Sequence, residues 1–110
     1  MTIESNQVGE KVVLSVAGRM DAENAPEFET ACQSWIGQGV TGLVVDVGDL
    51  DYVSSMGLRS FMSIGKILQS KGGKLQICRQ RGLVKQVFEI TRLNSVFPPH
   101  ESVEAALAED

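Results

Sequence analysis

The stretch that most constrains the fold is residues 43–70, where an apolar run, a polar loop and a helical pattern follow one another. Residues 43–47 read Leu-Val-Val-Asp-Val, and a short β-branched run of this kind predicts a buried strand. The loop after it ends in two adjacent hydroxyl residues, Ser54 and Ser55, and an amphipathic pattern then continues to Ser70. A strand, a loop and a helix in this order are the parts from which α/β layers are built.

Strand and helix patterns alternate in the rest of the chain as well. Strands are predicted for two runs within residues 2–17 that are joined by a turn near Gly9, for residues 74–78, and for a short run at 95–97 that Pro98 and Pro99 stop. Helices are predicted for residues 28–36, 83–91 and 101–109, and Asn24 and Glu27 have the spacing of a capping box before the first of them. The opening hairpin adds an antiparallel pair to an otherwise parallel sheet. We therefore expect an α/β fold in which four helices pack on a mixed β-sheet of about five strands.

The helical pattern over residues 55–70 separates a polar face from an apolar one. At about 100° per residue, one side collects Arg59, Ser63, Lys66 and Ser70, with Ser55 projecting near Arg59. The opposite side, which should face the sheet, collects Gly57, Phe61, Ile64, Gly65 and Leu68. Met56 and Met62 fall on the two borders, so we expect them to be half exposed. They are either the periphery of the core or a soft contact patch for a partner.

Length, charge and cysteine spacing exclude several classes of protein. With 110 residues the chain is long enough for one core, so residues 1–110 are expected to form a single domain. No apolar run approaches the roughly 20 residues that a membrane helix needs, and the first residues lack the pattern of a signal peptide. We expect a cytoplasmic protein without membrane insertion.

A net charge of -4 argues against nucleic acid as a partner. Cys32 and Cys78 lie far apart in apolar patterns, which predicts buried, reduced thiols.

No catalytic constellation is present in the sequence. A serine nucleophile needs a base within reach, and the only histidine, His100, lies beside Pro98 and Pro99 near the end of the chain, where we expect it to be exposed. The chain has no phosphate-binding loop and no dinucleotide fingerprint. Asp46, Asp49 and Asp51 alternate along a strand end and turn, a spacing more typical of solvated turns than of a metal site. We expect no enzyme activity, no metal and no cofactor.

Ser54 and Ser55 have two interpretations from the residues alone. A serine before a helix often caps it, because its oxygen accepts a hydrogen bond from a free backbone N–H. The same helix start, with free N–H groups and a partial positive charge, also accommodates a phosphate. A serine that is phosphorylated there would act as a switch.

The segment Val53-Ser54-Ser55-Met56-Gly57-Leu58, preceded by Val-Val-Asp-Val and by Gly18-Arg19-Met20-Asp21, resembles the STAS domain of anti-sigma factor antagonists. The resemblance spans roughly residues 10 to 108 and includes the order of the elements. It implies a serine phosphorylated two residues before the glycine, here Ser55. It also implies that the unphosphorylated protein binds an anti-sigma factor that is often also the serine kinase, and that a serine phosphatase resets the switch.

The resemblance further implies a partner contact at Asp21 and matches Asp46 to an Asp or Asn at the end of the central strand. We expect partner contacts at Asp21, Ser54, Met56, Arg59 and Met62, with Asp46 and Gly57 as structural residues near the site.

Two departures from the family pattern leave alternatives open. Ser54 stands where the family commonly has Asp, and Met56 stands where a small residue is usual. Ser54 is therefore a rival acceptor of the phosphate. The missing acid also favours an alternative function, a non-switching STAS scaffold subunit of a transporter or sensory complex. A third alternative is a nucleotide or small anion bound at the same helix start.

Overall fold

Residues 1–109, the part of the chain that the computed structural model describes, form four strands, four α-helices and one short 3₁₀ helix. The strands are β1 (Thr2–Val8), β2 (Lys11–Met20), β3 (Gly42–Val53) and β4 (Lys74–Cys78). The helices are α1 (Ala25–Gly37), α2 (Ser55–Ser70), α3 (Gly82–Ile90), η1 (Leu93–Ser95) and α4 (Val103–Ala108). No helix in this part of the chain is long and apolar enough to cross a membrane.

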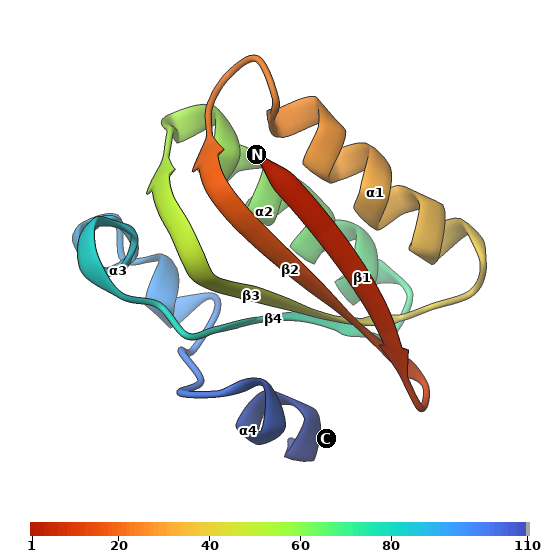
Figure 1. Cartoon of the computed structure of the whole chain (residues 1–110). Helices are drawn as coiled ribbons and strands as arrows, with labels where there is room; N and C mark the ends of the chain where they lie inside the picture. The colour runs from red at the N-terminus through yellow and green to blue at the C-terminus, as the bar shows by residue number, and fades with distance from the viewer. Residues whose placement is uncertain (110) are drawn as a thin grey trace.

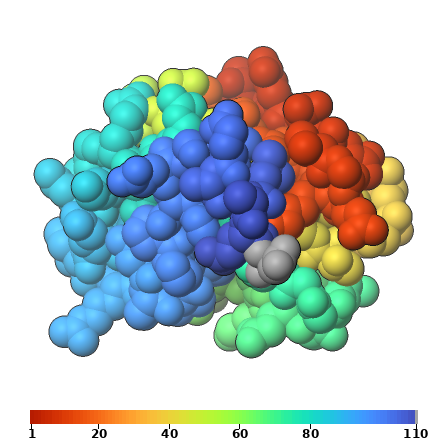
Figure 2. Space-filling model, turned by 90° about the horizontal axis from the view of Figure 1, so that it is seen from below, coloured from red at the N-terminus to blue at the C-terminus, as the bar shows by residue number. Residues whose placement is uncertain are grey.

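The strands form one mixed sheet in the order β1-β2-β3-β4. β1 and β2 pair antiparallel, whereas β2 with β3 and β3 with β4 pair parallel. α1 and α2 lie side by side on one face of the sheet, and α4 lies on the other face (Figure 1). Seen from below, the blue C-terminal residues rest against the red and orange N-terminal hairpin (Figure 2). Lys11 holds them there, because its ammonium donates to the Ala106 and Glu109 carbonyls at 3.4 and 2.7 Å. The prediction of a mixed sheet with four helices is confirmed.

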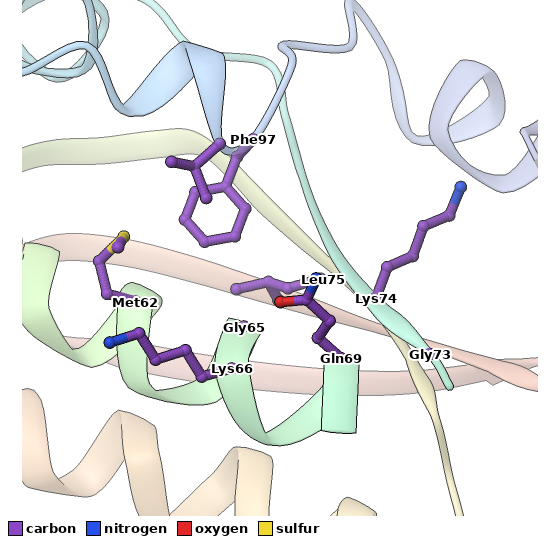
Figure 3. Close-up of a pocket in the computed structure, with 9 residues that line it drawn as sticks. Met62, Gly65, Lys66, Gln69, Gly73, Lys74, Leu75 and Phe97 are labelled. Atoms are coloured by element: carbon purple, nitrogen blue, oxygen red, sulfur yellow. The ribbon is translucent and has the colours of Figure 1, made fainter. Parts of the chain in front are cut away.

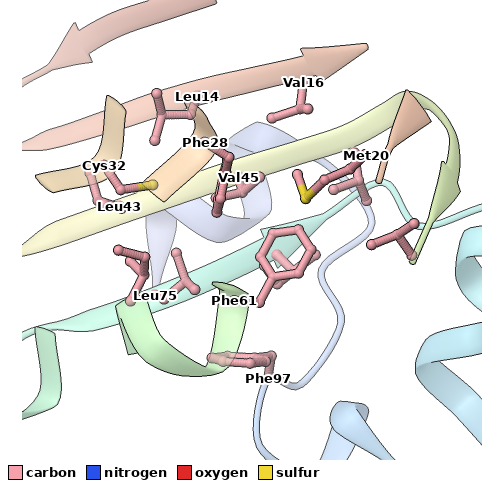
Figure 4. Close-up of a cluster of buried hydrophobic side chains, with 14 of the residues drawn as sticks. Leu14, Val16, Met20, Phe28, Cys32, Leu43, Val45, Phe61, Leu75 and Phe97 are labelled. Carbon is pink, nitrogen blue, oxygen red and sulfur yellow. The ribbon is translucent and has the colours of Figure 1, made fainter. Parts of the chain in front are cut away.

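The main core lies between the sheet and the helices α1, α2 and α3. Alternate residues of β2 and β3, such as Leu14 and Val45, point into it (Figure 4). Three phenylalanines from three different helices meet there: the Phe28 and Phe61 ring centroids are 5.1 Å apart, and those of Phe61 and Phe88 are 5.6 Å apart. The first pair is edge-to-face and the second is tilted, and aromatic pairs of this kind add about 0.5–1.5 kcal/mol each to the free energy of burial. The core therefore fixes how α2 sits on the sheet.

The predicted fifth strand at residues 95–97 is wrong. Leu93–Ser95 is a 3₁₀ helix, and the backbone N–H of Phe97 donates back to the Leu93 carbonyl at 2.8 Å. Phe97 is buried for another reason, because its ring lies over Gly65 of α2. Beyond β4 the described chain adds only a single bridge to the sheet, between Cys78 and His100. The described sheet therefore has four strands.

The central strand is longer than the sequence pattern indicates. β3 has 12 residues and runs through Gly48 and Asp49, which resemble a turn in the sequence. Its pairing with β2 shifts register twice, so the ladder passes these residues and continues to Val53. Such irregularities insert an extra residue without ending the strand. As a result, the strand delivers the chain directly to Ser54.

Both cysteines are fully buried and unpaired, as predicted. Burial raises the pKa of the Cys32 thiol to about 12, with a smaller contribution from the charge of Glu29. Burial likewise raises the pKa of the Cys78 thiol to about 12, and the charge of Asp46 adds to the shift. Both groups are therefore protonated thiols at neutral pH and act as small core residues.

Candidate functional site

The adjacent serines lie at the edge of the sheet where β2 and β3 end. Met20 and Val53 are paired as the last residues of these parallel strands, and the Ser54 N–H donates to the Met20 carbonyl at 2.8 Å. The loop that follows β2 and the start of α2 therefore meet at one place (Figure 1). Ligand and partner sites of α/β sheets commonly form at the carboxyl ends of strands, where such loops gather.

The two serines have different surroundings. Ser54 has extended backbone angles, and its hydroxyl oxygen accepts a hydrogen bond from the Gly57 N–H at 3.2 Å, so it is the N-cap of α2. Ser55 is the first residue of the helix and is exposed. Its hydroxyl makes no hydrogen bond to any residue from 1 to 109. One hydroxyl is thus engaged in capping, whereas the other is open to an incoming group.

Replacing Ser54 by alanine should lower the free energy of unfolding by about 1 kcal/mol, because the Gly57 N–H loses its acceptor. Ser55→Ala should change it by less than about 0.5 kcal/mol, since its hydroxyl makes no such bond. Urea unfolding of the two variants and the wild type measures the difference. Equal losses for both variants would contradict the distinction between the two hydroxyls.

Gly57 allows α2 to start close against the strand ends. A Cβ atom added at Gly57 would lie 2.7 Å from Cγ2 of Val53 and 2.9 Å from Sδ of Met20. Contacts shorter than van der Waals distance would push the first turn of the helix away from the core. Gly57 therefore sets the position of Ser55 relative to the sheet.

Asp21 shapes the neighbouring loop. One of its carboxylate oxygens accepts hydrogen bonds from the N–H groups of Glu23 and Asn24, at 3.0 and 3.1 Å. Asn24 closes the loop from the other side, because its side chain accepts from the Asp21 N–H and donates to the Arg19 carbonyl. With these bonds made, Asn24 does not cap α1 with its side chain, and the predicted capping box with Glu27 is wrong. Asp21 directly follows Met20, so the structure brings it to the same edge as the serines.

The first turns of α2 present an exposed surface beside Ser55. Met56 is 42% exposed and Arg59 is also exposed, while Met62 is partly buried against the core. This agrees with the border positions predicted for the two methionines. α2 contains no Asp or Glu, and its two charged residues, Arg59 and Lys66, are both positive. The exposed face of α2 next to Ser55 therefore carries positive side chains and is partly apolar.

Two contacts that the sequence analysis missed support this surface. Ser60 is buried, and its hydroxyl donates to Oε2 of Glu29 at 2.7 Å, which ties the start of α2 to α1. The guanidinium carbon of Arg19 lies 4.2 Å from the ring centroid of Tyr52, at the ends of β2 and β3. Both pairs join residues about 30 positions apart in the chain, so no local pattern predicts them.

Asp46 is structural, but the prediction that it lies near the site is wrong. It sits in the middle of β3, seven residues before Val53, which corresponds to about 20 Å along the strand. Its carboxylate accepts hydrogen bonds from Nη1 of Arg79 at 2.9 and 3.1 Å and from the Gly48 N–H at 2.9 Å. The hydrogen bond and the charge of Asp46 raise the pKa of the Arg79 guanidinium. This ion pair fastens the end of β4 to β3.

Comparison with known proteins places these features in a family. A family model described as STAS domain matches residues 2–106. A candidate anti-sigma factor antagonist of Bordetella bronchiseptica, BtrV, is 32% identical over 108 residues, which cover 98% of this chain and 93% of that protein. The crystal structure of an anti-sigma factor antagonist from Mycobacterium paratuberculosis has a TM-score of 0.86 at 24% identity, covering 96% of this chain and 90% of that one. The phosphorylated form of SpoIIAA from Bacillus has a TM-score of 0.75 at 18% identity and covers 96% of both chains.

Proposed function

This chain belongs to the STAS domain family, and we propose that it is an anti-sigma factor antagonist whose binding is switched by phosphorylation of Ser55. The observation that carries the proposal is the open hydroxyl of Ser55 at the first position of α2, next to a capping serine whose hydroxyl is engaged. The similarity to BtrV supports the choice of partner class, because that relative is named as an antagonist of this kind.

The proposed modification follows the chemistry of a serine kinase. The Ser55 oxygen attacks the γ-phosphorus of ATP, the bond to ADP breaks, and the hydroxyl proton passes to a base of the kinase. The product carries about -1.5 to -2 charges at neutral pH. The start of α2 tolerates this charge because it has free N–H groups and no acidic residue in the first turn. We therefore expect the fold to persist after phosphorylation.

The switch then acts at the contact with the partner rather than within this domain. An anti-sigma factor that covers Ser55, Met56 and Arg59 when Ser55 is unmodified would have to accommodate a desolvated dianion after phosphorylation. Juxtaposed like charges at an interface cost several kcal/mol, and each 1.4 kcal/mol is tenfold in affinity. In this scheme the unmodified chain sequesters the anti-sigma factor, and a serine phosphatase restores the binding form. The protein is a binding partner rather than an enzyme, and it acts in the cytoplasm, where sigma factors meet RNA polymerase.

The test is phosphorylation by an anti-sigma factor kinase from the same genome, followed by mass spectrometry of the intact chain and its peptides. We expect one phosphate per chain on the wild type and on Ser54→Ala, and none on Ser55→Ala. A phosphate that remains on Ser55→Ala and disappears from Ser54→Ala would assign the modification to Ser54 instead. An unmodified wild-type chain with every such kinase would contradict the switch.

The competing function is a non-switching scaffold subunit of a transporter or sensory complex. Ser54 in place of the acid usual in the family favours it, because a kinase that recognises that acid would lose a contact. A scaffold would bind its partner equally well as wild type and as Ser55→Asp, so measuring the affinity of both chains for the partner separates the two functions.

A further inference from the structure

A groove runs along α2 on the flank opposite to Ser60, which faces α1. It has a volume of about 330 Å³ and is bounded by α2, by the start of β4 and by the segment after η1 (Figure 3). Its apolar lining includes Met62, Leu75, Val96 and Phe97. The Val96 side chain is 52% exposed, although it is apolar and its neighbour Phe97 is buried. The groove is therefore an apolar depression open to the surface.

The shape of the groove depends on Gly65. A Cβ atom added there would lie 2.9 Å from the ring of Phe97, so the ring packs directly on the helix backbone. Phe97 itself is buried, and the Met62 side chain borders the same space (Figure 3). Because buried core residues form its wall, the groove keeps its shape without a partner.

Among residues 1–109, the charged residues that line the groove are both lysines, Lys66 and Lys74. Lys74 is paired with Glu109 at 3.0 Å, whereas Lys66 is exposed and makes no ion pair with any residue from 1 to 109. Arg59 extends the positive charge along α2 toward Ser55. This is notable in a chain with 14 acidic and 10 basic residues.

We propose that this groove receives the apolar face of an acidic amphipathic helix of the anti-sigma factor, an inference that rests on the proposed function. Helices dock in apolar grooves through anchors at positions i, i+3, i+4 and i+7. Carboxylates beside those anchors would meet Lys66 and Arg59. Ser55 and Lys66 are 11 residues apart on α2, which is about 16 Å, so one partner surface of ordinary size reaches both.

If the partner occupies this groove, phosphorylation of Ser55 weakens its binding in a second way. A phosphate on Ser55 adds about two negative charges to a helix whose own side chains carry two positive ones. The positive field that attracts the acidic helix is then largely cancelled, while the apolar groove is unchanged. The phosphate therefore weakens the partner's electrostatic attraction along α2 as well as its contact at Ser55.

The first experiment measures binding of the anti-sigma factor to Lys66→Glu, with Lys85→Glu as the matched control. Lys85 is an exposed lysine on α3 outside the groove, so the two variants have the same net charge. Lys66→Glu should bind about tenfold more weakly and show a smaller dependence on salt, whereas Lys85→Glu should stay within about twofold of the wild type. Equal losses for the two variants would overturn the groove and leave the Ser55 switch intact.

The second experiment does not depend on an anti-sigma factor. An NMR titration uses a synthetic helical peptide with leucines at i, i+3, i+4 and i+7 and glutamates elsewhere, and a second peptide with lysines in place of the glutamates. The acidic peptide should shift the resonances of Met62, Gly65 and Val96, and the basic peptide should not. Equal effects of both peptides, or no effect of either, would overturn the proposed chemistry. Shifts of these resonances by decanoate but not by the acidic peptide would assign the groove to a small amphiphile and also overturn it.

Discussion

A chain carrying Ser55→Asp should bind its anti-sigma factor about a hundredfold more weakly than the wild type, which corresponds to about 2.8 kcal/mol. Ser55 is exposed at the first position of α2, so the new carboxylate lies in the partner contact. A desolvated charge facing like charges accounts for a loss of this size. The fold should not suffer, because an acidic residue in the first turn is favourable to a helix. Isothermal titration measures the affinity, and circular dichroism checks the fold.

Two control variants test whether the loss of affinity depends on a negative charge at position 55 in particular. Gln86→Asp places the same charge on the exposed face of α3, outside the proposed contact along α2, and should weaken binding much less. Ser55→Ala removes the hydroxyl without adding charge and should stay within about threefold of the wild type. If wild type, Ser55→Ala and Ser55→Asp bind equally, Ser55 is not the switch.

Replacing Gly73 by alanine should lower the free energy of unfolding by about 2–4 kcal/mol. A Cβ atom there would lie 1.8 Å from the carbonyl oxygen of Thr41, and a backbone atom cannot turn aside as a side chain does. That oxygen also accepts the N–H of Lys74 at 3.0 Å, so relieving the overlap breaks the first bond of β4. Overpacking costs about 1–3 kcal/mol, and a lost hydrogen bond adds about 1 kcal/mol. Urea unfolding measures the sum.

The adjacent glycine is the matched control. Gly72 has a φ of +79°, but an added Cβ would meet nothing within 4 Å. Gly72→Ala should therefore cost only the strain of a left-handed backbone, about 1–2 kcal/mol. A larger loss for Gly72→Ala than for Gly73→Ala would contradict the close approach of Gly73 to Thr41. If Gly73→Ala does not fold at all, its low yield beside a folded Gly72→Ala agrees with the prediction.

Local periodicity was enough to predict much of the fold. The 3.6-residue pattern of α2 correctly assigned Phe61, Ile64 and Leu68 to the core and Arg59 and Lys66 to the surface. Alternation and turn residues correctly predicted β1, β2 and β4, and the hairpin predicted the antiparallel pair. These features follow from the sequence because each depends on residues within a few positions of one another.

The predictions that were wrong concern residues whose structure depends on contacts with distant parts of the chain. The run at 95–97 has the composition of a strand, but Phe97 is buried against Gly65, 32 residues earlier in the chain. Gly48 and Asp49 resemble a turn, but pairing with β2 carries β3 past them. Asn24 has the spacing of a cap, but the Asp21 loop takes its side chain. In each case a contact with another segment outweighed the local preference.

The sequence by itself determined that a hydroxyl pair opens the central helix, and that this helix has a positive outer face. Only the tertiary structure decided which hydroxyl is free: Ser54 bonds to Gly57 because β3 ends directly before it beside Met20, and Ser55 is left exposed. The tertiary structure alone also shows that Asp46 forms an ion pair with Arg79 in the middle of β3, and that a groove lies beside Phe97. Helix faces are set by neighbours along the chain, whereas partners and grooves are set by which distant segments the core brings together.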